Sequence, residues 1–400
     1  MPPRAYRSPV ARKPRVMIYV EPVVLRGDPL FFANWMIAID RWASASGAEV
    51  DFHLVSSPAL LERARADYVS RVAVDSDAIL EPFGGDRRRY MRDVCGDATG
   101  NDALRAALSQ AQARIAPDIV VSWTPNAYLP AAFGEASVLY TENGPAPRHG
   151  CVLVKYLDPF AHQAGSAFER LVEPLWPDSP HDAALDWLAQ WRAVMARDAE
   201  RRGIADWIAT LPQTRRRVLV ALQPPDSLTY EGIGPDLSPL QYLAMVAARA
   251  SPDDVVIPQW HPAQPPPTQQ DLDWIARQAP GVAPPPAAFR TGLSEHLAAH
   301  VDEIVTISSN VALLALLLGK ALRVDGRAKF AALQTRAGET PAPRPDLLSF
   351  TLERYCDPSA DWDAPGFFAH RIQALARDPE ALFGVSRLTP ERARRYLRGA

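Results

Sequence analysis

The sequence predicts an α/β protein with two domains, and two observations lead to this fold class. Short runs of β-branched and apolar residues alternate with stretches whose apolar residues recur at helical spacing, which is typical of parallel α/β sheets. The series starts afresh near residue 212, and 400 residues are long for one core but sufficient for two. We therefore expect an N-terminal domain at 1–211, a C-terminal domain at 212–375 and a closing helical segment at 376–400.

The elements of the first domain follow from these runs. The apolar run 15–20 predicts a first strand, and the helical spacing of apolar residues in 30–46 predicts the helix after it. Further strands are expected at 50–55, 118–123 and 137–141, and further helices at 101–116 and 182–210.

The second domain repeats the alternation without any internal sequence repeat. Strands are expected at 217–223, 254–258, 301–307 and 321–326, with helices at 240–250, 272–278 and 311–318 between them. Helices at 362–376 and 389–397 close the chain.

Composition narrows the class of protein. A net charge of −3 gives no support to nucleic-acid binding, and three widely spaced cysteines without CxxC spacing predict free thiols in a reducing cytoplasm. The apolar helix 311–318 is far shorter than the roughly 20 residues that a spanning helix requires, so we expect a cytoplasmic protein. The basic ends, 1–15 and 391–398, leave peripheral contact with the inner membrane as an alternative to solvated termini.

One β-α-β unit at 301–330 predicts a phosphate site. Ser308, Ser309 and Asn310 follow a buried strand and precede an apolar helix, so hydroxyl groups and free backbone amides meet at the positive helix terminus. Read alone, they form an ordinary helix cap.

A second residue of this kind stands at the end of the strand 254–258. His261 follows this strand and precedes Pro262, on the rim where open α/β sheets bind ligands. Read alone, His261 is a turn histidine. Two such positions on neighbouring strand ends favour nucleotide binding.

Four segments, in this order, resemble motifs of the capsular polysaccharide biosynthesis family, which includes the bacterial β-Kdo transferases. They read YTENGPAPRHGCVLVKYLDPFAHQAGS at 140–166, VLVALQPPDSLTY at 218–230, WHP at 260–262 and TISSNVALLALLLGKALRVDGRAKF at 306–330. The chain departs from the family pattern at several positions. Gln259 and Trp260 replace Lys-Pro, Ser308 replaces Asn, and Leu314 stands where the family has Glu.

The resemblance, together with two α/β halves joined near residue 212, implies a GT-B-like architecture with two Rossmann-like domains facing across a cleft. In that architecture the donor binds the C-terminal half and the acceptor faces the N-terminal half. The resemblance also implies a CMP-activated donor sugar of the Kdo type and a glycan or glycolipid acceptor.

Two carboxylates are expected at the rims of the two sheets. Asp226 follows the strand 217–223, and Glu142 follows the strand 137–141. The resemblance implies that Asp226 is the nucleophile and Glu142 the acid/base of a transfer that retains anomeric configuration. The alternatives are a turn aspartate after Pro224-Pro225 and, for Glu142, a hairpin turn at Asn143-Gly144.

The other candidate residues surround these two carboxylates. The departing CMP phosphate would be held by His261, Ser308, Ser309 and Asn310, while Gln223 and Ser227 orient Asp226. A Kdo-type sugar carries a carboxylate at its reacting carbon, for which Arg148 and Lys155 are the candidate cations.

A metal-dependent transferase of the GT-A type would need an Asp-x-Asp motif at a strand end. Asp75-Ser76-Asp77 and Asp361-Trp362-Asp363 have this form, but neither lies near the phosphate-seeking strands. We interpret Asp75 as a loop or helix-cap residue and expect no metal and no cofactor.

The sequence thus predicts a glycosyltransferase that moves a Kdo-type sugar from CMP to a surface polysaccharide or glycolipid. One alternative is a GT-B transferase that uses another nucleotide sugar, because Leu314 replaces the family's Glu. The other is a non-catalytic subunit that binds sugar nucleotides or glycans.

Overall fold

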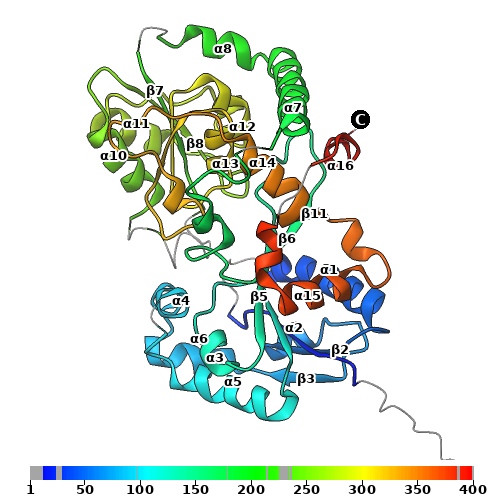
Figure 1. Cartoon of the computed structure of the whole chain (residues 1–400). Helices are drawn as coiled ribbons and strands as arrows, with labels where there is room; N and C mark the ends of the chain where they lie inside the picture. The colour runs from blue at the N-terminus through cyan, green and yellow to red at the C-terminus, as the bar shows by residue number, and fades with distance from the viewer. Residues whose placement is uncertain are drawn as a thin grey trace, which may run out of the picture.

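The computed structural model describes residues 12–398 except 24–28, 97, 178, 213–214, 225–233, 235–236 and 385–387. It contains two α/β halves, one above the other in Figure 1, that are linked by a long helix at the side of the molecule. One continuous apolar core runs through both halves, and a smaller apolar cluster lies on the far face of the second sheet.

The first half contains a seven-stranded sheet in the order β11-β6-β5-β4-β1-β2-β3. Its five parallel strands have the order 3-2-1-4-5 of a Rossmann-like sheet, to which β6 and β11 add antiparallel strands. The strands are β1 (Arg15–Tyr19), β2 (Asp51–Ser56), β3 (Ser70–Ala73), β4 (Ile119–Ser122), β5 (Ser137–Asn143), β6 (Val154–Asp158) and β11 (Cys356–Pro358).

Helices connect these strands across both faces of the sheet. The Asp75 side chain accepts hydrogen bonds from the backbone N–H groups of Asp77 and Ala78 and thereby caps the start of α3. The interpretation of Asp75 as a helix cap is therefore confirmed. The helices are α1 (Pro29–Ser46), α2 (Pro58–Leu61), α3 (Ser76–Leu80), η1 (Glu81–Phe83), α4 (Arg87–Cys95), α5 (Asp102–Ile115), α6 (Tyr128–Ala132) and η2 (Ala167–Leu171).

The second half contains a four-stranded parallel sheet in the order β10-β9-β7-β8. Residues of β7 alternate between its two faces: Val218 and Val220 pack with the cluster under α10 and α11, whereas Leu219 and Ala221 join the main core. The strands are β7 (Arg217–Ala221), β8 (Val255–Gln259), β9 (Glu303–Thr306) and β10 (Ala321–Val324). The helices are α10 (Pro239–Arg249), α11 (Gln269–Gln278), η3 (Ala287–Phe289), α12 (Ser294–Leu297), η4 (Ala298–His300), α13 (Val311–Leu317) and η5 (Ala331–Leu333).

The C-terminal part of the chain returns to the first half. After α7 (Asp182–Arg201) and α8 (Ile204–Thr210) lead into the second sheet, α14 (Pro345–Phe350) and the π-helical turn η6 (Thr351–Tyr355) lead back out of it (Figure 1). There β11 pairs with β6, and α15 packs on α1 and β5. The predicted second domain, 212–375, therefore includes elements that the structure places with the first sheet. The last elements are η7 (Asp361–Asp363), α15 (Phe367–Arg377), η8 (Pro379–Phe383) and α16 (Pro390–Arg394).

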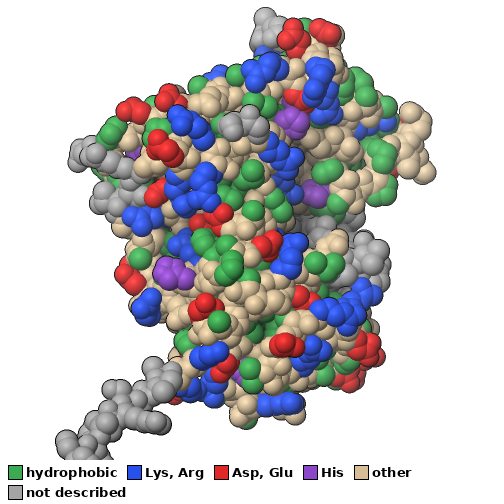
Figure 2. All heavy atoms as spheres, turned by 90° about the vertical axis from the view of Figure 1, so that its right-hand side faces the viewer, with side chains coloured by type: hydrophobic (Ala, Val, Ile, Leu, Met, Phe, Trp, Pro, Cys, Tyr) green, Lys and Arg blue, Asp and Glu red, His purple; other side chains and the backbone are tan. Residues whose placement is uncertain are grey.

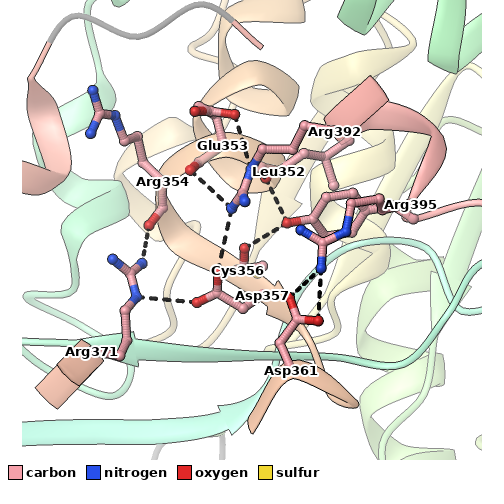
Figure 3. A network of polar contacts seen from close by, with 10 residues as sticks. Leu352, Glu353, Arg354, Cys356, Asp357, Asp361, Arg371, Arg392 and Arg395 are labelled. Atoms are coloured by element: carbon pink, nitrogen blue, oxygen red, sulfur yellow. Dashed lines mark hydrogen bonds and ion pairs between the residues drawn. The ribbon is translucent and has the colours of Figure 1, made fainter. Parts of the chain in front are cut away.

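A network of ion pairs fixes this returning segment (Figure 3). Asp357 of β11 accepts hydrogen bonds from Arg371 at 3.1 Å and from Arg392 at 3.3 Å. Arg395 pairs with Asp361 at 2.6 Å. Two arginines of the basic end 391–398 are thus engaged within the chain, and Figure 2 shows basic and acidic side chains interspersed over this face. Within the described part of the chain, no helix is both long enough and apolar enough to cross a membrane.

The strand order reverses between β1 and β4 in the first sheet and between β7 and β9 in the second. Open α/β sheets bind ligands outside the carboxyl ends of the strands at such reversals. Residues that follow the strand ends of both sheets line one common cavity between the halves. The predicted GT-B-like architecture, two Rossmann-like halves facing across a cleft, is therefore confirmed.

Candidate functional site

The candidate site is a cavity of about 460 Å³ between the two halves. The first half supplies Trp35, Trp123, Glu142, Asn143, Arg148, His149 and Gln163. The second half supplies Ala221, Leu222, Gln223, Gln259, Trp260, His261, Pro262, Gly292, Ser294, Glu295, Ser308, Ser309, Asn310 and Val311. Seven residues predicted from the sequence therefore lie around one space: Glu142, Arg148, Gln223, His261, Ser308, Ser309 and Asn310.

Glu142 lies within β5, which extends two residues beyond the predicted strand end. It pairs across the antiparallel ladder with Tyr156, and its side chain is 28% exposed. The alternative of a tight hairpin turn at Asn143-Gly144 is wrong, because ten residues separate β5 from β6. The glycine at position 144 is required for a different reason. A Cβ at Gly144 would lie 2.5 Å from the Cys356 sulfur, so glycine is required there by close packing.

A buried polar cluster lies behind Glu142. The Nε2 atom of His162 is 3.6 Å from a Glu142 carboxylate oxygen. Burial, together with the nearby charge of Lys329, lowers the pKa of His162 to about 3, so the imidazole is neutral at pH 7. Burial also lowers the pKa of Lys329, although Glu142 and Asp158 oppose that shift. Glu142 thus faces the cavity with a neutral imidazole and a buried lysine behind it.

Lys155, predicted as a cation for the donor, is almost completely buried and does not line the cavity. Its Nζ donates to Asn143 at 2.7 Å and lies 3.7 Å from the centre of the Trp35 ring. Burial lowers the pKa of Lys155 to about 8. Asn143 and Trp35 line the cavity instead, and so does the other candidate cation, Arg148.

His261 follows β8 and is held by its own turn. The backbone N–H of Ala263 donates to Nδ1 of His261 at 3.1 Å. In the neutral imidazole the proton must then be on Nε2, which makes this atom a hydrogen-bond donor. The turn therefore sets both the orientation and the tautomer of the ring.

Ser308, Ser309 and Asn310 connect β9 to α13, a helix of seven residues. The N–H of Ser309 donates to the Thr306 hydroxyl at 3.1 Å, and the Ser309 hydroxyl accepts from the N–H of Val311 at 3.3 Å. Ser309 therefore acts as a local cap. The Ser308 hydroxyl oxygen is buried and has no hydrogen-bond partner among the described residues, so it is available to a ligand in the cavity.

Gln223 follows β7 beside these residues and is 8% exposed. The predicted nucleophile Asp226 and its neighbour Ser227 lie outside the described residues.

The departures from the family pattern have structural consequences. The Gln259 side chain donates to the carbonyl of Phe289 at 2.7 Å and accepts from the N–H of Leu293 at 3.0 Å. A lysine can only donate, so glutamine ties the following loop to β8 in a way that the family's lysine cannot. Leu314 is 2% exposed within the apolar helix α13 and does not line the cavity.

A group that the sequence did not indicate lies at the edge of the cavity. The Asp198 carboxylate oxygen Oδ2 is 3.2 Å from Nε2 of His149 and 2.8 Å from Nε2 of His296. Two histidines and a carboxylate can bind zinc, but this carboxylate also pairs with Arg201 and Arg202. Burial disfavours the Asp198 charge, yet the hydrogen bonds from His296 and Arg201 outweigh burial and hold the pKa of Asp198 at about 2. The group thus joins the halves through one carboxylate that contacts both histidines and both arginines.

No protein-family model and no curated protein sequence matches this chain. Among solved structures, it is similar to the KpsC β-Kdo 2,7 transferase of Thermosulfurimonas dismutans, at 13% identity and a TM-score of 0.42, over 85% of this chain and 91% of that one. It is also similar to the KpsC β-Kdo 2,4 transferase of the same organism, at 16% identity and a TM-score of 0.37, over 65% and 87%. A UDP-GlcNAc 2-epimerase from Neisseria meningitidis aligns at 10% identity and a TM-score of 0.28, over 95% and 97%. The β-Kdo transferases suggested by the sequence thus recur among solved structures, and the sheet order above is what assigns the fold.

Proposed function

We propose that this protein is a glycosyltransferase that takes a Kdo-type sugar from a CMP donor and transfers it to a surface polysaccharide or glycolipid. The observation that carries the proposal is the cavity between the halves. Glu142 from the first half meets His261, Ser308 and Ser309 from the second there, at the carboxyl edges of both sheets.

The second half would hold the departing CMP phosphate. The N–H at Nε2 of His261 is a donor at the switch point of the second sheet, and so is the Ser308 hydroxyl, which has no hydrogen-bond partner among the described residues. Negative charge grows on the phosphate as the glycosidic bond breaks, so donors aimed at it stabilise the transition state more than the ground state.

The reaction follows from two carboxylates. In the first step the Asp226 carboxylate attacks the anomeric carbon, the bond from this carbon to the phosphate oxygen breaks, and CMP leaves. In the second step an acceptor hydroxyl attacks the same carbon, Glu142 takes the hydroxyl proton, and Asp226 is released as a carboxylate. Two displacements retain the anomeric configuration. The proposal needs no metal and no cofactor.

Calorimetric titration of the protein with CMP, UDP and GDP tests the nucleotide. CMP at a hundred times its dissociation constant should stabilise the fold by about 2.7 kcal/mol, which a thermal-shift measurement also detects. We expect CMP to bind tightest. Tighter binding of UDP or GDP would contradict the CMP assignment.

One observation favours a second candidate, a transferase of the same architecture with a different nucleotide sugar. Leu314 is buried in α13 where the family has Glu, so the contact that this Glu makes with the donor is absent here. The same titration separates the two candidates. A non-catalytic binding subunit would bind CMP but would release none from CMP-Kdo, and Asp226 would be dispensable.

A further inference from the structure

Glu295 joins the two halves at the wall of the cavity. It belongs to α12 in the second half, and its two carboxylate oxygens accept the backbone N–H groups of Arg148 and His149 in the first half, at 2.8 and 2.9 Å. We infer that Glu295 is a positioning residue for the donor: it fastens the main chain of Arg148 to the second half and thereby sets the Arg148 side chain in the cavity. This inference rests on the proposed function.

Arg148 has a distinct place in the cavity. Of the described residues that line it, Arg148 is the only Lys or Arg, and the acidic ones are Glu142 and Glu295. A CMP-linked Kdo-type donor carries a phosphate and a carboxylate, and a guanidinium group binds either in a bidentate manner. Donor binding therefore depends on where the Arg148 side chain stands.

The surroundings of the Glu295 carboxylate favour its hydrogen bonds with the Arg148 and His149 main chain. Burial raises the pKa of Glu295, and the two N–H groups from the first half oppose that shift. The charges of Arg148 and His149 oppose it as well. A partly buried carboxylate needs its hydrogen bonds, and the two N–H groups across the interface are the largest contributions that offset the burial of Glu295. Glu295 and the Arg148 main chain therefore stabilise each other only while the halves stay together.

A second contact next to Glu295 fixes the same loop. His149 and His296, the residues that follow Arg148 and Glu295, both approach one oxygen of Asp198 on α7. In addition, the Trp191 indole N–H of α7 donates to the His149 carbonyl at 3.1 Å. The loop that carries Arg148 is thus held by α12 and by α7, so loss of Glu295 should release the Arg148 main chain without unfolding the junction.

A double-mutant cycle tests the inference, with Arg148→Ala, Glu295→Ala and the two combined. Each single variant should raise KM for CMP-Kdo about tenfold, the range of a lost charge-assisted hydrogen bond, with a smaller change in kcat. If Glu295 acts through Arg148, the double variant should be no worse than Arg148→Ala. Glu295→Gln, which keeps one acceptor oxygen, should recover part of the loss. Effects that multiply, or an unchanged KM in Glu295→Ala, would overturn the inference.

Hydrogen exchange separates this inference from the proposed function. The amides of Arg148 and His149 should exchange faster in Glu295→Ala and at the parent rate in Glu303→Ala. The latter variant removes a carboxylate that pairs with Arg216 at 2.6 Å, away from the cavity. Unchanged exchange in Glu295→Ala would show that Glu295 does not anchor the loop. If the parent protein binds no CMP, the proposed function and the donor role of Arg148 both fail, and the exchange result still decides the anchoring.

Discussion

His261→Asn isolates the donor that we assign to the nucleotide phosphate. In the parent protein, Nδ1 of His261 accepts the N–H of Ala263 at 3.1 Å, and Nε2 carries the proton. An asparagine oxygen can accept a backbone N–H two residues ahead, so the turn should persist while the Nε2 donor is lost. A hydrogen bond to a charged group contributes about 1.5–3 kcal/mol, which predicts CMP binding weaker by about 10- to 150-fold.

Calorimetry with CMP on His261→Asn, His261→Ala and His300→Ala measures this loss. His300 is an exposed histidine at the end of η4 that does not line the cavity, so its variant should bind CMP like the parent. Both His261 variants should weaken binding alike, because both lack the Nε2 donor. Parent-like affinity in His261→Asn together with a loss in His261→Ala would show that only the turn matters, and the phosphate assignment would be refuted.

Three further predictions concern the cavity and the core. Gly144→Ala should lower the free energy of unfolding in urea by about 1–3 kcal/mol, because its Cβ would meet the Cys356 sulfur at 2.5 Å; parent-like stability would contradict the packing argument. Glu142→Gln should abolish transfer and leave CMP affinity unchanged, and loss of both would mean a nucleotide-binding or structural role instead. Burial raises the pKa of Glu21 from 4.5 to about 7. The contribution of the Glu21 side chain to the free energy of unfolding is therefore fully present below pH 4.5 and is lost as the pH rises through 7. Relative to the parent, Glu21→Gln should therefore gain stability by up to about 3 kcal/mol between pH 4.5 and 7 in urea unfolding, and a constant difference would refute this.

The sequence predicted the meeting of the site residues because parallel strands end at one edge of a sheet. His261 follows β8 and Ser308 follows β9, so one common edge brings them together without any knowledge of side-chain contacts. The Val- and Ile-rich runs located these strands, since strands buried on both faces are continuously apolar. Glu142 was placed by the same argument from the other half.

Two of the strands that escaped prediction, β3 and β11, lack this signal. β3 has one buried residue of four, as expected for the edge of a sheet. β11 ends in Pro358 and pairs with a strand far away in the sequence, and proline is tolerated at a sheet edge. Its return to the first half shows why composition alone could not place the domain boundary.

Glu295 shows a different limit. Its partners are backbone N–H groups of the opposite half, and every residue except proline carries such a group. No residue type or spacing could therefore have indicated this contact. Lys155, by contrast, has the charge that a donor carboxylate needs, but the sequence did not reveal its burial between Asn143 and Trp35.

The central claim is that the cavity between the halves binds the CMP of the donor. A crystal structure of the protein with CMP tests it most directly. We expect the phosphate within hydrogen-bond distance of Nε2 of His261 and of the Ser308 hydroxyl, with the nucleoside against the second sheet. CMP bound at any other place, or an empty cavity at a saturating CMP concentration, would contradict the account.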